Sequence, residues 1–168
     1  MTSPASLTTD RPTHLLAVDL GLRCGLACFL LPGPGNHAPR LRWYRSTHFG
    51  SPRQMKDAIR GILREASPLA ALVLEGDRTL ATPWQRTAER RGARSLVLGA
   101  ETWRNDLLHA REQRSGGDAK RAADRYARDL IRNSELSAPH SLRHDAAEAI
   151  LIGWWACTHW FAAAPPAP

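Results

Sequence analysis

Apolar and polar residues alternate in a pattern that predicts several strands first and helices later. Short apolar runs separated by turns rich in glycine and proline predict strands over 14–19, 26–31 and 41–48. A longer stretch from Ser51 has apolar residues three and four positions apart, which predicts a helix that ends before Pro68. The three leading strands, joined by short connections, predict an antiparallel meander.

The rest of the chain alternates between strands and helices. The fully apolar run 69–74 predicts a buried strand with parallel neighbours, and a short strand is expected over 95–98. Helices are predicted over about 82–91, from about 101, through 132 after a polar loop at 114–117, and over 141–161. This order predicts an α/β fold, with a mixed five-stranded sheet flanked by helices.

The length of the chain fits one domain with a short segment at each end. A chain of 168 residues with 43% hydrophobic content can bury a single core. Residues 1–13, rich in Thr, Ser and Pro, and the tail 162–168 predict disordered ends around one domain over 14–161. No signal peptide and no uncharged stretch of membrane-spanning length is found, so we expect a cytoplasmic protein without membrane contact.

The net charge indicates the kind of partner, and the cysteine content bears on disulfides and zinc sites. The chain has 23 Lys+Arg against 16 Asp+Glu, a net charge of +7, and nearly all the cations are Arg. Arg suits phosphate recognition, which favours a nucleic-acid partner, although GC-rich coding DNA would also enrich Arg over Lys. Cys24, Cys28 and Cys157 are too few and too scattered for a disulfide framework or a zinc site, and we expect buried free thiols.

Four acids stand at the end of an apolar segment or inside one. Asp19 and Glu75 each close a predicted strand, and Asp145 and Glu148 lie three residues apart, on one face of the last predicted helix. A carboxylate beside a buried strand is tolerated only at the rim, where water or a metal reaches it. Any one of these acids could be a solvated residue at the end of an element. Together, on a basic chain, they predict a hard-cation site that faces a polyanion, as in a metal-dependent nuclease.

This chemistry has a defined ligand requirement. Two Mg²⁺ ions about 4 Å apart can activate water, stabilise the leaving oxygen and neutralise a phosphodiester, and Mg²⁺ prefers carboxylate and water ligands. Asp19, on a rigid strand, would bridge the ions, and Glu75 would reach them from the neighbouring strand. Asp145 and Glu148 would close the site from the opposite side. We expect Mg²⁺ as the cofactor, with Mn²⁺ able to substitute and no small-molecule cofactor.

The same segments resemble a known family. Residues 16–27 (LAVDLGLRCGLA) are similar to the first strand and turn of the RuvC-like nucleases of the RNase H-like superfamily. Residues 72–76 (LVLEG) resemble the Glu of their fourth strand, and 144–152 (HDAAEAILI) resembles their C-terminal helix motif. The resemblance extends over about 14–161 and implies an RNase H-like fold. Actin-like ATPases share the first motif, but they need a longer chain and phosphate loops that are absent here.

The resemblance also implies roles for individual residues. It implies that Asp19, Glu75, Asp145 and Glu148 bind metal, with Glu148 where the family commonly has Asp. It implies that Lys120 approaches the scissile phosphate, although an ordinary exposed lysine at a helix start is the alternative. Lys120 is one of only two lysines in the chain. Arg104 stands where related proteins place another cation that contacts phosphate.

Further DNA contacts are expected from the predicted helix that carries Lys120. Arg121, Arg125, Arg128 and Arg132 crowd the same helix. A solvated basic face explains this pattern as well as DNA contact does, but proximity to Lys120 favours phosphate contact at the N-terminal end. Some RuvC-like enzymes have an aromatic wedge shortly after the fourth-strand Glu. Residues 76–80 (GDRTL) contain no aromatic, and Arg78 could stack on a base in its place.

These observations predict a Mg²⁺-dependent endonuclease that cleaves branched DNA, with the four-way (Holliday) junction of DNA recombination and repair as the leading substrate. Flaps, single-stranded segments and RNA–DNA hybrids are alternative substrates, and a non-catalytic DNA-binding module on the same fold is the alternative from another class. Symmetric cleavage of a junction implies a homodimer. The aromatic residues at 154, 155, 160 and 161 could supply its interface, although core packing is their default role.

Overall fold

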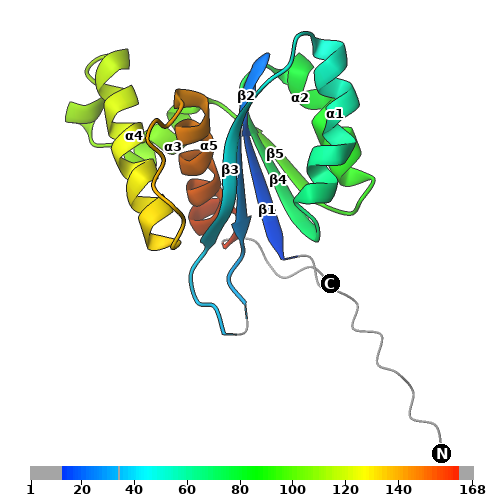
Figure 1. Cartoon of the computed structure of the whole chain (residues 1–168), viewed down its shortest axis with the longest axis horizontal. Helices are drawn as coiled ribbons and strands as arrows, with labels where there is room; N and C mark the ends of the chain where they lie inside the picture. The colour runs from blue at the N-terminus through cyan, green and yellow to red at the C-terminus, as the bar shows by residue number, and fades with distance from the viewer. Residues whose placement is uncertain (1–12, 34, 163–168) are drawn as a thin grey trace, which may run out of the picture.

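The computed structural model describes residues 13–33 and 35–162 and contains one five-stranded sheet (Figure 1). The strands follow the order β3-β2-β1-β4-β5, in which β1 is antiparallel to β2, β2 is antiparallel to β3, and β4 is parallel to β1 and β5. Their bounds are β1 His14–Asp19, β2 Arg23–Leu30, β3 Arg40–His48, β4 Leu69–Glu75 and β5 Arg94–Leu98. The predicted meander and mixed sheet are therefore confirmed.

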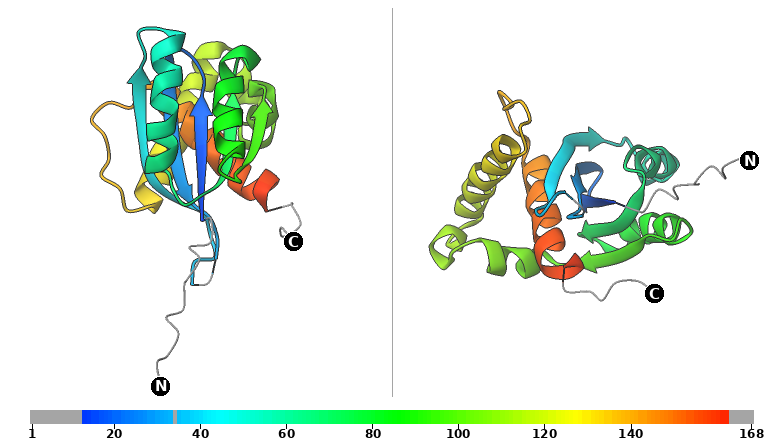
Figure 2. Two further views of the ribbon diagram at one scale, coloured as in Figure 1. Left: turned by 90° about the vertical axis from the view of Figure 1, so that its right-hand side faces the viewer. Right: turned by 90° about the horizontal axis from the view of Figure 1, so that it is seen from below.

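Helices cover both faces of the sheet (Figures 1 and 2). On one face lie α1 and α2, and on the other lies α5, which separates the sheet from α4. The bounds are α1 Pro52–Glu65, α2 Arg78–Glu89, α3 Ala100–Leu107, α4 Gly116–Asn133 and α5 His144–Trp155. A 3₁₀ turn, η1 (Ala110–Gln113), precedes α4, and a π-helical segment, η2 (Ala156–Phe161), continues α5.

The alternation of side chains along β1 divides the core into two apolar clusters. Leu15 and Ala17 pack beneath α5, whereas Leu16 and Val18 pack beneath α1 and α2. All four side chains are fully buried. Helix α5 is apolar around most of its circumference because it is enclosed between the sheet and α3 and α4. A polar side chain on α5 therefore needs a specific partner.

Three predicted starts differ from the structure by three residues or more. Strand β2 begins at Arg23, because the preceding turn is only three residues long. Helix α2 begins at Arg78, because the Asp77 carboxylate caps it by accepting from the backbone N–H groups of Thr79 (2.7 Å) and Leu80 (3.1 Å). Helix α5 begins only at His144.

The ends of the predicted domain are close to those of the described structure. Thr13, assigned to the disordered N-terminus, instead donates its N–H to the carbonyl of Pro68 at 2.9 Å and accepts from the N–H of Leu31. The other residues assigned to disordered ends lie outside the described residues, except Ala162, which forms part of a turn. All three cysteines are free and buried, as predicted. No helix within the described residues has the length and apolar content needed to cross a membrane.

Candidate active site

A row of paired residues crosses the sheet where β1 and β4 end. Asp19 on β1 lies opposite Glu75 on β4 in the parallel register, and opposite Gly25 on β2 in the antiparallel register. Gly25 in turn lies opposite Ser46 on β3. Two of the four predicted acids are thus direct cross-strand neighbours, although 56 residues separate them in the sequence.

Both of these acids point toward the α5 side of the sheet. Successive side chains of a strand alternate between its faces, and Ala17 and Val73 belong to the core beneath α5. Asp19 and Glu75, two residues further along β1 and β4, therefore project to the same side. Both are only half-buried, because the two strands end there.

The first turn of α5 rests directly on the backbone of β2 at this row. A Cβ added to Gly25 would lie 1.7 Å from the carbonyl oxygen of Asp145, so only glycine permits this approach. The Ser46 hydroxyl donates to Oδ2 of Asp145 at 2.5 Å. These contacts bring Asp145 next to Asp19 from the other side of the site.

Two consecutive residues of α3 hold the other acids. Nε1 of Trp103 donates to Oε2 of Glu75 at 3.1 Å, and Nη2 of Arg104 donates to Oε1 of Glu148 at 2.6 Å. The Glu148 side chain is only 17% exposed. Arg104 neutralises the charge of this largely buried carboxylate. The Nε of Arg104 is buried without a hydrogen-bond partner among the described residues.

The four acids share one electrostatic field. The pKa of Asp19 is raised to about 8, chiefly by burial and then by the negative charges of Glu148, Glu75 and Asp145, while the charge of Arg104 opposes the shift. The pKa of Glu75 is also raised, chiefly by burial, while the Trp103 hydrogen bond opposes the shift. Negative charge is therefore concentrated here in excess of the cationic charge beside it.

This excess of carboxylate oxygens fits a hard divalent cation by donor type and position. Among the described residues, however, no three acidic, histidine or cysteine side chains form a ready-made metal-binding group. Glu148 is turned toward Arg104 and Asp145 toward Ser46. Of the four acids, only Asp19 accepts no hydrogen bond through its carboxylate from residues 13–33 and 35–162. Metal binding here requires Glu148 and Asp145 to rotate toward Asp19.

Lys120 lies on the surface of α4, beside the start of α5. It lines a shallow hollow together with His144, which immediately precedes Asp145. Lys120 is exposed and forms no ion pair with a described residue. Arg121 pairs with Asp118 at 2.5 Å, and Arg125 pairs with Glu112 of η1. Both arginine side chains are more than half exposed, and pairs that solvent screens are weak, so both remain able to contact phosphate.

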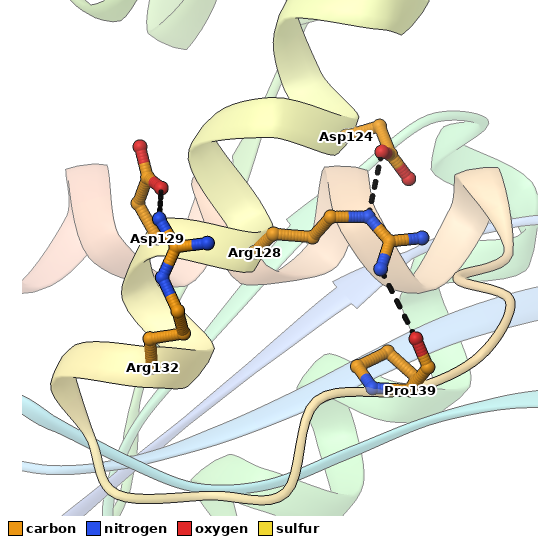
Figure 3. A network of polar contacts seen from close by, with 5 residues as sticks. All are labelled: Asp124, Arg128, Asp129, Arg132 and Pro139. Carbon is orange, nitrogen blue, oxygen red and sulfur yellow. Dashed lines mark hydrogen bonds and ion pairs between the residues drawn. The ribbon is translucent and has the colours of Figure 1, made fainter.

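Arg128, grouped with the DNA-facing cations in the sequence, has an internal role instead (Figure 3). Its Nε donates to Asp124 at 2.8 Å, and its Nη1 donates to the carbonyl oxygen of Pro139 at 3.1 Å. Arg128 thereby ties the segment 134–143 to α4, ahead of the acid-bearing start of α5. Arg132, one turn further along, pairs with Asp129 on the same helix.

Arg78 occupies the first position of α2, three residues after Glu75. It is exposed and forms no ion pair with a described residue. Gly76 precedes it with φ of +124°, and a Cβ there would lie 3.1 Å from that of Leu20. The turn after β4 therefore packs against the turn after β1, which places Arg78 at the acid-bearing edge of the sheet.

Sequence reasoning missed three residues of the site: Gly25, Ser46 and Trp103. A glycine inside an otherwise apolar strand signals close backbone approach, and this signal could have identified Gly25. The position of Ser46 follows only from the register of β2 and β3. Trp103 is fully buried and reads as a core residue, yet its indole N–H orients Glu75.

The sequence matches no protein-family profile and no curated protein. Among solved structures, the fold is similar to that of Thermus thermophilus RuvC, with a TM-score of 0.57 and 14% identity over 84% of this chain and 91% of that chain. T. thermophilus RuvC in complex with Holliday junction substrate gives a TM-score of 0.56 and 14% identity, covering 84% and 90%. The chain has a RuvC-like fold. The resemblance to this RNase H-like architecture, predicted from the sequence, is thus confirmed at the level of the fold.

Within this RuvC-like fold, the aromatic residues considered for a dimer interface are largely engaged inside the chain. Trp155 is buried, and its Nε1 donates to Asp106 at 2.6 Å. The rings of Trp160 and Phe161 lie against the guanidinium of Arg94, with 4.8 and 5.3 Å from its Cζ to the ring centroids. The homodimer stays a prediction, and these residues give it little support.

Proposed function

We propose that this protein is a divalent-metal-dependent endonuclease that cuts branched DNA, with the four-way (Holliday) junction as its main substrate. The observation that carries this proposal is the meeting of Asp19, Glu75, Asp145 and Glu148 at one end of the sheet, on a chain with a net charge of +7. A cluster of half-buried carboxylates is costly unless a cation offsets its charge.

The roles of the acids follow from their positions. Mg²⁺ held here would activate the attacking water and neutralise the phosphate. Asp19, on the central strand, would be the shared ligand, because its carboxylate oxygens have no competing donor. Trp103 donates to one oxygen of Glu75, which leaves the second oxygen for the cation, and Asp145 would offer an oxygen after turning from Ser46 toward Asp19. Glu148 would complete the set after it leaves Arg104.

Cations around the acids would position the DNA. Lys120, beside the start of α5, is suited to approach the reacting phosphate as a compact charge. Arg104, once released from Glu148, would offer its guanidinium to a neighbouring phosphate oxygen. Arg78, Arg121 and Arg125 would contact the backbone or a base further from the cut.

Branched DNA is the substrate we favour, because a solved structure with a similar fold is described in complex with Holliday junction substrate. Paired cuts across a junction need two active sites of like polarity, so we propose a homodimer that forms on the DNA or before it. A cytoplasmic location, with a role in DNA recombination or repair, completes the proposal.

Cleavage assays on synthetic DNA test the function. Four-way, three-way, flap, single-stranded, RNA–DNA hybrid and linear substrates would be incubated with Mg²⁺, Mn²⁺ or a chelator. We expect symmetric paired nicks near the branch point of the four-way substrate, only with Mg²⁺ or Mn²⁺. If only another substrate were cut, that substrate would replace the junction in the proposal. Tight junction binding without cleavage would indicate a DNA-binding module instead.

A further inference from the structure

A groove between α1 and α2 opens on the face of the sheet opposite α5. Its cations are Lys56 and Arg60 from α1, Arg86 from α2 and Arg90, the residue that caps the end of α2. The other lining residues are Thr79, Thr82, Pro83 and Thr87 of α2. Figure 2 shows these two helices side by side on the sheet, away from α5. The groove is thus separate from the acid site.

The groove collects cations without acids. No Asp or Glu lines it. On each helix the two cations are four residues apart, so they stand one turn apart on the same face. None of the four is in an ion pair with a described residue. The arginines of α4 differ, since each of them is paired, as in Arg121–Asp118 and Arg125–Glu112.

The two acids nearest in sequence do not neutralise the groove. Asp57 lines an adjoining hollow that shares Lys56 with the groove, but it forms no ion pair with a described residue, and Glu89 accepts a hydrogen bond from Ser95 on β5. The lining residues also include three threonines, whose hydroxyl groups add polar character. Open, polar and cationic, the groove suits an extended polyanion better than an apolar partner.

The groove begins at the same edge of the sheet as the acids. Helix α2 starts three residues after Glu75, and α1 starts four residues after the end of β3, which is parallel to β1. Both helices run from this edge toward the opposite end of the sheet (Figure 1). A nucleic-acid strand that leaves the acid site over this edge would therefore enter the groove.

We propose that this groove binds the phosphate backbone of a DNA arm that extends from the reaction site. The choice of DNA rests on the proposed function, whereas the preference for a polyanion rests on the groove itself. A second copy of the chain fits less well, because two-fold contact through this groove would oppose four cations to four cations. The groove therefore extends the DNA footprint to the second face of the sheet.

Binding measurements with arms of increasing length test this proposal. The quadruple variant Lys56→Gln/Arg60→Gln/Arg86→Gln/Arg90→Gln would be compared with the wild-type protein by fluorescence anisotropy over a range of salt concentrations. We expect about tenfold weaker binding or more, and a salt slope shallower by up to about 3.6, since each lost phosphate contact removes about 0.9. The gain in affinity with arm length should be lost, while single-turnover cleavage at saturating DNA is unchanged.

A charge-matched pair of variants makes the test specific. Arg60→Gln/Arg86→Gln removes two groove cations, and Arg40→Gln/Arg42→Gln removes two exposed cations from β3, outside the groove. The first should weaken binding to long-armed DNA at least threefold more than the second. Equal losses of affinity in the two double variants would mean that only the net charge of the protein matters, and not the groove. Wild-type binding by the quadruple variant would overturn the proposal. A change in its oligomeric state by light scattering would assign the groove to self-association instead.

This test is independent of catalysis. If the wild-type protein cut no DNA, the proposed function would fail, yet the salt slope and arm-length dependence would still report on the groove. If it cut junctions but the groove variants bound long arms normally, only the groove proposal would fail.

Discussion

The two faces of the sheet differ in charge and in how closely their helices approach it. On the α5 face, Gly25 lets the start of α5 touch β2, and a Cβ on Gly153 would lie 2.4 Å from the Phe29 ring. Helix α5 is therefore seated on β2 near both of its ends. On the other face, α1 and α2 pack against the sheet through large side chains such as Ile59 and Trp84, and the one glycine of α1, Gly61, faces solvent. The acids lie on the closely packed face, and the cationic groove lies on the other.

This difference indicates how the fold can position acids for chemistry. Cation ligands must be placed within a fraction of an ångström, which close backbone packing and fixed hydrogen bonds provide. Contacts to the phosphate backbone of DNA need less precise placement, because a long Arg or Lys side chain can adjust to a phosphate. The following predictions test this division between a precise face and an adaptable one.

The largest effect is expected from removing a carboxylate on the α5 face. Asp19→Asn, Glu75→Gln or Asp145→Asn should reduce cleavage by at least about a thousandfold, because each removes a ligand of the proposed cation. DNA affinity should be unchanged or higher, since a negative charge facing phosphate is lost. Glu148→Gln should be milder if its contact runs through water. Full activity in any of the first three variants would refute the site assignment.

A large effect on stability is expected from Gly25→Ala. The new methyl would meet the Asp145 carbonyl, so α5 must shift, and we expect a loss of about 3 kcal/mol or more in the free energy of unfolding. Gly61→Ala is the matched control on the other face and should add about 0.5–1 kcal/mol. Denaturant titration measures both. Similar values for the two variants would contradict the close seating of α5.

A moderate effect is expected from Lys120→Ala. Its charge would act near the reacting phosphate, so cleavage at saturating DNA should slow by about 10- to 100-fold with little change in affinity. Arg125→Ala, on the same helix, should mainly weaken binding and reduce the salt slope by about 1. Single-turnover kinetics and anisotropy separate the two. A loss of affinity alone would move Lys120 to the same class as Arg125.

The smallest effect is expected from Arg104→Gln, with opposite signs for stability and metal binding. Arg104 competes with a cation for Glu148, so Mg²⁺ affinity by calorimetry should rise by about fivefold, the equivalent of ~1 kcal/mol. Thermal stability in chelator should fall, because Glu148 loses its partner. Arg121→Gln, whose partner Asp118 lies outside the acid site, should change neither by as much. A fall in both quantities would make Arg104 merely structural.

Much of the fold and the positions of the acids could be predicted from the sequence. Asp19 and Glu75 each follow an apolar run that can only be a buried strand, and the spacing of Asp145 and Glu148 places them on one helix face. Local ion pairs such as Arg128–Asp124 also follow from their spacing along a helix. The Asp77 cap, however, was missed, because the helix was predicted to begin only at about 82.

Contacts between distant segments could not be predicted. Arg104 and Glu148 are 44 residues apart, and Ser46 and Asp145 are 99 apart, so their pairing depends on strand register and helix seating. The internal role of Arg128 depends on the path of a loop without a sequence signal. The residues that hold the acids were therefore missed, although the acids themselves were found.

Locating bound Mn²⁺ tests the central claim most directly. Crystals grown or soaked with Mn²⁺ would be measured at a wavelength where manganese scatters anomalously. We predict one or two anomalous peaks beside the Asp19 carboxylate, with ligands from Glu75 and Asp145, and with Glu148 turned away from Arg104. The same experiment on Asp19→Asn should show the peaks lost or much weakened. No peak at Asp19 in the wild-type protein, with Arg104 and Glu148 still paired, would contradict the proposed metal site.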